Sequence, residues 1–131
     1  MSCLKIVFSN SSLTFSPTGA DRFDREDEKW LETELIVKTL SFSGKITDSI
    51  YVDDFKAFEV SLKKLLSNEL QEATLSCIEE FLEIRVKKLD SLGNFKVFTK
   101  VRSDDSELSF YSTTDQISLF QLIDNIDRFV S

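Results

Sequence analysis

The chain has 131 residues, of which 23 are acidic and 16 are basic, so its formal net charge is −7, and it contains no histidine. This length suits one domain with one core over residues 1–131, and a composition of 41% hydrophobic and 30% charged residues excludes a disordered or fibrous chain. Without histidine the chain lacks the Ser-His-Asp and Cys-His catalytic pairs and the usual imidazole zinc ligands, which makes an enzyme the least favoured class.

The first elements predicted are two short strands. Residues 4–8 and 13–15 alternate apolar and polar side chains around the polar residues 9–12, a pattern that predicts a β-hairpin. Residues 16–29 then contain the only proline, a glycine and five acidic side chains, so an exposed loop is expected there.

Residues 30–42 have the alternation of a long strand, but its apolar face changes near Val37 to Leu40. A bulge or bend at that point explains the change, and burial of the second half of the strand on both faces explains it equally well. Gly44 then turns the chain into a strand over residues 46–52, which completes a second hairpin.

The next segment shows the three- and four-residue spacing of apolar side chains that predicts an amphipathic helix. Either Asp53 or Asp54 can accept from the free amides of its first turn. The expected inward stripe consists of Phe55, Phe58, Leu62, Leu65 and Leu66.

Alternation returns over residues 75–77 and 82–87, and its change of parity near Glu79 and Glu80 predicts a bulge. Turns at residues 90–94 and 104–106 then delimit strands at 95–102 and 107–111, which with 82–87 form a three-stranded antiparallel meander.

The chain closes with a second predicted helix. Thr113 and Gln116 match a capping box at its start. The expected inward stripe consists of Ile117, Phe120, Ile123 and either Ile126 or Val130. Short strands joined by turns do not supply the crossovers that parallel strands need, so the fold class is α+β. We expect an antiparallel sheet of about six to eight strands with the two helices packed on one face.

No sequence motif for chemistry is present. The chain has no Gly-rich phosphate loop, no G-x-S-x-G motif and no calcium-loop spacing, so neither catalytic residues nor a metal or cofactor is expected. Residues 1–8 lack the features of a secretory signal, and no segment approaches the ~20 apolar residues of a membrane helix. We therefore expect a cytoplasmic protein with no membrane partner, in which Cys3 and Cys77 are reduced.

Charge is unevenly distributed. The segment from Arg85 to Arg102 has six basic residues and one acidic residue, a net charge of +5, and places Phe98 among the basic side chains. Such a face can contact phosphates and stack a base, or it can solvate a sheet and pair with neighbouring acids. The negative charge of the whole chain favours the second interpretation and excludes nucleic acid as the expected partner.

Several segments together resemble the WapI family of bacterial immunity proteins over about residues 28 to 131. They are the Trp30-Leu31 pair that opens a strand, the strand and helix of residues 50–66, the meander and the closing helix. In residues 77–84, Glu79 and Leu82 match the family pattern Phe-x-Glu-Pro-x-Leu-x-Phe. Cys77, Glu80 and Ile84 replace its Phe, Pro and Phe.

The resemblance implies a non-catalytic protein that binds the toxic C-terminal domain of a polymorphic or contact-dependent toxin and blocks it by occlusion. Acidic balance fits a basic toxin domain, because opposite charge accelerates encounter. The expected contacts are Asp21, Asp24, Glu26, Asp27 and Glu28 in the loop, with Glu79, Glu80 and Glu83 as a second set. The alternatives are an unrelated interaction or assembly module of bacterial or phage origin and, least favoured, an enzyme. An open sheet edge could also support a homodimer.

Overall fold

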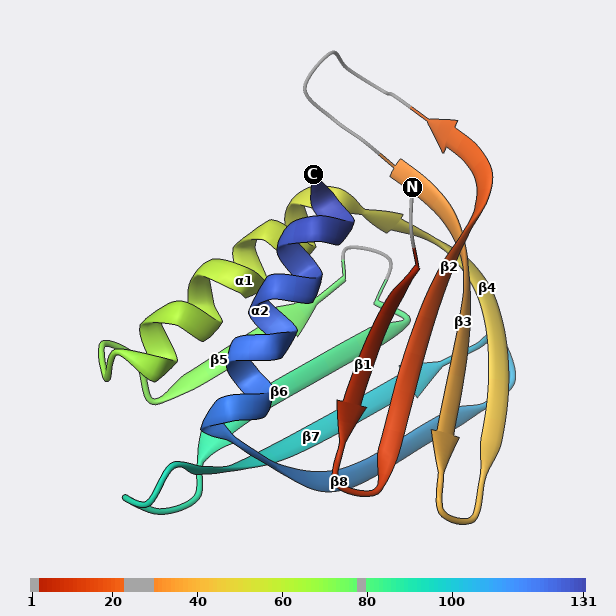
Figure 1. The fold of residues 1–131 in the computed structure, drawn as a ribbon. Helices are drawn as coiled ribbons and strands as arrows, with labels where there is room; N and C mark the ends of the chain where they lie inside the picture. The colour runs from red at the N-terminus through yellow and green to blue at the C-terminus, as the bar shows by residue number, and fades with distance from the viewer. Residues whose placement is uncertain (1–2, 23–29, 78–79) are drawn as a thin grey trace.

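The computed structural model describes residues 3–22, 30–77 and 80–131, and Figure 1 shows their arrangement. The described residues form eight strands and two helices in which four strands and a helix are followed by the same order again. The elements are β1 (Leu4–Phe8), β2 (Ser11–Arg22), β3 (Trp30–Thr39), β4 (Ser43–Tyr51), α1 (Val52–Leu66), β5 (Glu72–Ser76), β6 (Leu82–Lys88), β7 (Asn94–Arg102), β8 (Glu107–Asp115) and α2 (Gln116–Val130).

The strands form two antiparallel sheets, ordered β1-β2-β3-β4 and β5-β6-β7-β8. The α+β class and the expected number of strands are confirmed, but the strands divide between two sheets instead of lying in one. The division follows from α1, which leads the chain away from β4 so that β5 begins a new sheet. Figure 1 shows both helices on the same side of the molecule, where α1 packs against β5 and α2 packs against α1 and β1.

The first sheet corrects two expectations. The segment expected as a loop from residue 16 continues as strand β2 to Arg22, because β2 pairs with β3 as far as Trp30, with a register shift between Pro17 and Asp21. Strand β3 keeps the same buried face along its length and pairs with β4 without a shift, so it has neither the bulge nor the two-sided burial considered above.

The change in apolar face near the end of β3 has a simpler origin. Leu40 and Phe42 lie beyond the end of the strand, in the turn to β4, and are 88% and 66% exposed. Their side chains therefore belong to neither face of β3.

In the second sheet, the expected bulge near Glu80 is a reversal of the chain between β5 and β6, which pair with each other. The Glu80 amide donates to the carbonyl oxygen of Cys77 at 2.8 Å, and Glu80 has a positive φ of 58°. Positive φ is typical of turns and not of strands. The expected meander of β6, β7 and β8 is confirmed.

The first helix confirms its expected inward face, since Phe55, Phe58, Leu62 and Leu65 are buried. The cap differs, because Tyr51 occupies the N-cap position without a side-chain hydrogen bond. Aromatic rings in the core connect α1 to the first sheet and to α2. The Phe55 ring lies edge-on to the Phe15 ring of β2, with 5.4 Å between ring centroids, and to the Phe129 ring of α2, with 5.8 Å.

The second helix begins two residues later than the capping box required. Asp115 is its N-cap and accepts from the Ser118 amide at 2.7 Å, whereas Thr113 belongs to β8. The inward stripe is also different, because Ile117 and Phe120 are 72% and 52% exposed. The buried residues of this helix are Leu119, Leu122, Ile123, Ile126 and Phe129.

Candidate functional site

The acidic loop that was expected to make the main contacts is only partly described. Asp21 lies in β2, opposite Leu31 of β3 in the strand register. Asp24, Glu26, Asp27, Glu28 and Glu79 lie outside the described residues. The role of these acids as contacts therefore stays a prediction.

Glu80 and Glu83, the two described members of the second acidic set, are paired with basic side chains of the second sheet. The Glu83 carboxylate lies 2.8 Å from the Nε atom of Arg85, and the Glu80 carboxylate lies 3.8 Å from a guanidinium nitrogen of Arg102. Both pairs are exposed to solvent, so each contributes little to stability. Their charges nevertheless offset one another, which makes this sheet face less anionic than the sequence alone suggested.

The outward face of the second sheet carries a row of basic and aromatic side chains. Arg85, Phe98 and Tyr111 are neighbours across β6, β7 and β8. The Arg85 guanidinium lies 5.0 Å from the centroid of the Phe98 ring, and the Phe98 and Tyr111 rings lie 5.2 Å apart. The Lys96 ammonium lies 4.6 Å from the Tyr111 ring centroid. These are cation–π distances, so the two rings are packed against cations of their own sheet.

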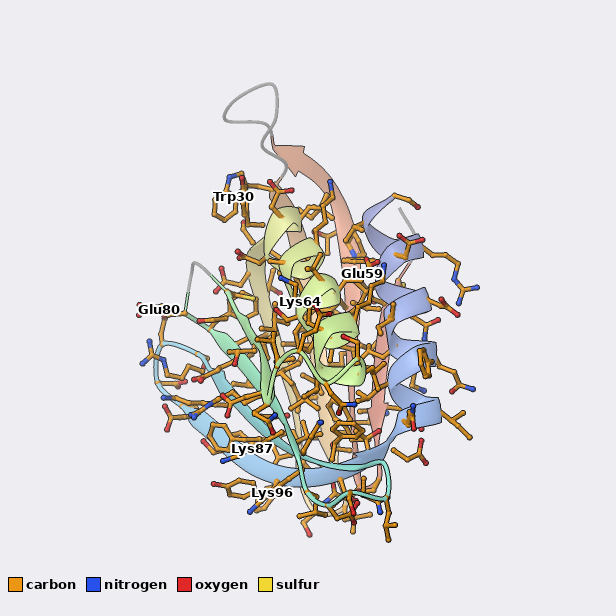
Figure 2. The ribbon with its side chains drawn as sticks, turned by 90° about the vertical axis from the view of Figure 1, so that its left-hand side faces the viewer. Trp30, Glu59, Lys64, Glu80, Lys87 and Lys96 are labelled. Carbon is orange, nitrogen blue, oxygen red and sulfur yellow. The ribbon has the colours of Figure 1, made fainter. Side chains whose placement is uncertain are left out.

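Lys87 and Lys96 lie directly opposite each other in the register of β6 and β7. Figure 2 shows both side chains at the margin of the molecule away from α2.

Among the described residues, Lys100 is 3.7 Å from the carboxylate of Glu107, which adds a third pairing of this basic segment with an acid. The interpretation in which the basic side chains pair with neighbouring acids therefore accounts for three of them.

A further charged cluster lies on α1, near two acids of α2. Glu59 is buried on α1, and its carboxylate lies 3.0 Å from the Lys63 ammonium. Figure 2 shows Glu59 on the side of α1 that faces α2. The bond to Glu59, together with the charges of Asp127 and Asp124 on α2, raises the pKa of Lys63 above its ordinary value. The ion pair itself lies within α1, and the two acids of α2 act on Lys63 only through their charge.

A groove that the sequence analysis missed lies between the two sheets, where the turns after β3 and β7 meet. Its volume is about 420 Å³. Core residues form its floor, since Val37 and Val101 are buried and Ile46 and Leu108 are half-buried against the core. The sequence hinted at this groove only through the change of apolar face at Leu40 and Phe42, because these two residues form the turn beside it. The other lining residues are Phe42, Ser43, Gly44, Lys45, Ser103, Asp105, Ser106 and Glu107.

The rim of the groove carries two acids, Asp105 and Glu107, and the cation Lys45, which pairs with Glu34 at 3.4 Å. Hydrogen bonds from the Ser106 and Ser103 hydroxyls to Asp105 lower the pKa of this carboxyl below its ordinary value, so it is anionic at neutral pH. Glu107 stands beside it at the start of β8. The two carboxylates of this rim suit recognition of a cationic group.

Within residues 3–22, 30–77 and 80–131, no three side chains of Cys, Asp or Glu converge as they would to hold a metal ion. None of the helices in that described part is both long and apolar enough to cross a membrane.

Comparison with known proteins agrees with the resemblance found in the sequence. The model of the Immunity protein WapI-like family matches residues 5–131, which extends the likeness through the first hairpin. No curated protein matches the chain in sequence.

Two solved structures are similar to the chain at low sequence identity. One, described as crystal structures of MRP1/MRP2 from trypanosoma bruciei, is 9% identical with a TM-score of 0.50, and the match covers 96% of this chain and 81% of that one. The other, the plant transcriptional regulator PBF-2, is 13% identical with a TM-score of 0.44, and the match covers 99% and 81% of the two chains. At such identity the first likeness concerns the fold alone.

Proposed function

Since the chain belongs to the WapI-like immunity protein family, we propose that it binds and neutralises the toxic C-terminal domain of a polymorphic or contact-dependent bacterial toxin. The family match over residues 5–131 carries this proposal, because it spans nearly the whole chain. The proposed mechanism is occlusion of the toxin's active surface, without chemistry by this chain. The protein acts in the cytoplasm, where the toxin would otherwise reach its target.

Electrostatics supports a basic toxin domain as the partner. The net charge of −7 attracts a cationic protein over a distance and raises the rate of productive encounters. We assign the first contacts to the acids of residues 21–28. Glu80 and Glu83 make a smaller contribution, because Arg102 and Arg85 already offset their charge.

The test uses the toxin domain encoded next to the gene of this chain. Expression of that domain alone should arrest growth of the host cells, and co-expression of this chain should restore growth. The purified proteins should also form a stable complex on size-exclusion chromatography. Growth arrest that persists despite soluble expression of this chain, with no complex formed, would contradict the proposal and favour an unrelated interaction module.

A further inference from the structure

Strand β4 is the open edge of the first sheet. It is the last strand in the order β1-β2-β3-β4, and within the described residues only β3 pairs with it. Figure 1 shows it on the outside of the molecule, on the side opposite the helices. A nine-residue edge strand is long enough to pair with another chain.

The hydrogen-bond pattern shows which groups of β4 are available. The Thr39 amide donates to the Phe42 carbonyl oxygen at 2.8 Å, so these residues form a hydrogen-bonded pair, and every second residue of β4 repeats that pairing. The intervening residues Ser43, Lys45 and Thr47 therefore direct their N–H and C=O groups away from β3. At the next such position the Ser49 amide donates at 2.8 Å to the side chain of its neighbour Asp48.

The groove described above lies beside the same edge. Gly44 faces it, and a Cβ atom added at Gly44 would meet no heavy atom within 4 Å. The inward face of β4 thus has an open position where most strands carry a side chain. An incoming strand could place an apolar side chain there, against Ile46 and Leu108, and remove their apolar surface from water.

Charge decides which strand fits. Asp105 and Glu107 stand on the rim of the groove, where the Lys100 ammonium lies 3.7 Å from Glu107, and Lys45, which also lines the groove, is paired with Glu34 at 3.4 Å. A second copy of this chain would bring a further net charge of −7 toward this acidic rim, which opposes self-association. A segment with a cationic side chain is complementary.

We propose that the edge of β4 and its groove receive an extended segment of the toxin domain as a fifth strand of the first sheet. The segment places one apolar side chain in the groove beside Gly44 and a Lys or Arg side chain next to Asp105 and Glu107. Side chains two residues apart on a strand point to the same face about 7 Å from each other. One such side chain could therefore enter the groove while the other reaches the two acids. Main-chain hydrogen bonds supply affinity and the side-chain positions supply selectivity. The proposal rests on the proposed function, because its occupant is the toxin domain.

Two substitutions test the two parts of the site, each with a matched control. Gly44→Leu fills the groove, and Thr47→Leu places the same side chain on the outward face of the same strand. Thr47→Pro removes one outward N–H group, which an edge strand tolerates, and Thr47→Val changes the same side chain but keeps that N–H. Thermal unfolding of all four variants shows that they are folded.

Binding of the toxin domain encoded next to this chain is measured for each variant by isothermal titration calorimetry. We expect Gly44→Leu and Thr47→Pro to weaken binding about tenfold or more, as substitutions at the centre of an interface do. Thr47→Leu and Thr47→Val should remain within about threefold of the unsubstituted chain. Hydrogen exchange of the Ser43, Lys45 and Thr47 amides should slow in the complex.

The outcomes separate this proposal from the proposed function. If the unsubstituted chain binds the toxin domain and Gly44→Leu and Thr47→Pro bind equally well, the docking site is wrong and the toxin-binding function stands. If the unsubstituted chain does not bind, both are wrong. If sedimentation shows a dimer that Gly44→Leu dissociates while toxin binding is unaffected, the occupant is a second copy and the proposal is overturned.

Discussion

The side-chain oxygens of Ser11 and Ser112 lie 2.9 Å apart, although 101 positions separate the two residues in the chain. Both residues are buried. Ser112 also donates to the side-chain oxygen of Asn10 at 2.5 Å, and because a hydroxyl has one proton, Ser11 is the donor in the serine pair. This pair connects the first residue of β2 to β8, and so joins the two sheets.

Removing the Ser112 hydroxyl should destabilise the fold. Ser112→Ala leaves the Ser11 donor and the Asn10 acceptor without their partner in a region with little water, which costs about 1–3 kcal/mol of unfolding free energy. Urea unfolding followed by circular dichroism measures the change. Ser109→Ala, at an exposed position of the same strand, is the control and should change the free energy by less than about 0.5 kcal/mol. Equal stability of both variants would show that the serine pair does not hold the sheets together.

The face of α2 that is buried differs from the expected one, as if the helix were rotated about its axis, and this gives a second prediction. Phe129 is fully buried and contacts the Phe55 ring, whereas Phe120 is 52% exposed. Phe129→Ala should therefore cost about 3–5 kcal/mol of stability through the lost burial and the cavity left behind. Phe120→Ala should cost less than about 1 kcal/mol. The same urea experiment measures both, and a larger cost for Phe120→Ala would mean that the opposite face of the helix packs on the core.

The rotation of α2 also shows what a sequence pattern can and cannot determine. Helical spacing predicted the helix itself, because apolar residues recur every three or four positions. Two such series coexist in α2, one that contains Ile117 and Phe120 and one that contains Leu119 and Phe129. Only contacts with α1 and β1 select between them, and those contacts are not local in sequence.

The same limit applies to the candidate binding surfaces, because their local patterns are visible in the sequence and their contacts between distant segments are not. Local alternation correctly placed the strands on both sides of the groove, but the groove itself arises from two turns about 60 residues apart in the chain. Likewise, the acidity of Glu80 and Glu83 was evident in the sequence, whereas their pairing with Arg102 and Arg85 depends on strand register. An argument from composition overestimates the net charge of a surface when opposite charges pair across neighbouring strands.

The two cysteines should differ sharply in reactivity. Burial, with smaller contributions from the nearby negative charges of Asp54 and Asp48, raises the pKa of the Cys77 thiol to about 12. Cys3 is exposed. Because the thiolate is the reactive form, one thiol per chain should react rapidly with Ellman's reagent at pH 8, and the second only on unfolding. Cys3→Ser should abolish the rapid phase, and a rapid phase that survives this substitution would contradict the burial of Cys77.

The same raised pKa predicts the direction of a pH effect on stability. An unfolded thiol ionises near pH 8.5 whereas the folded one stays neutral to about pH 12, so the unfolded state loses its proton first. The contribution of Cys77 to stability is therefore complete below about pH 8.5 and decreases as the pH rises toward 12. Comparing the unsubstituted chain with Cys77→Ala between pH 7 and 10 isolates it: the stability difference between the two should shift in favour of Cys77→Ala as the pH rises. A difference that stays constant would mean that the folded thiol ionises normally.

The acidic loop should control the rate at which this chain meets its toxin domain. Replacing Asp21, Asp24 and Asp27 with Asn and Glu26 and Glu28 with Gln removes five charges while leaving the size of each side chain unchanged. Association measured by stopped-flow should slow by about tenfold or more at low salt, and its dependence on ionic strength should weaken, because electrostatic steering is screened by salt. Dissociation should change less, since charges at the rim of an interface act mainly on the rate of association. The control variant neutralises five described acids outside residues 21–28 of the sequence, namely Asp53, Glu69, Glu72, Asp124 and Asp127. Its equal loss of net charge should slow association less, and if both variants slow it to the same extent, the total charge of the chain and not the position of the loop determines the encounter.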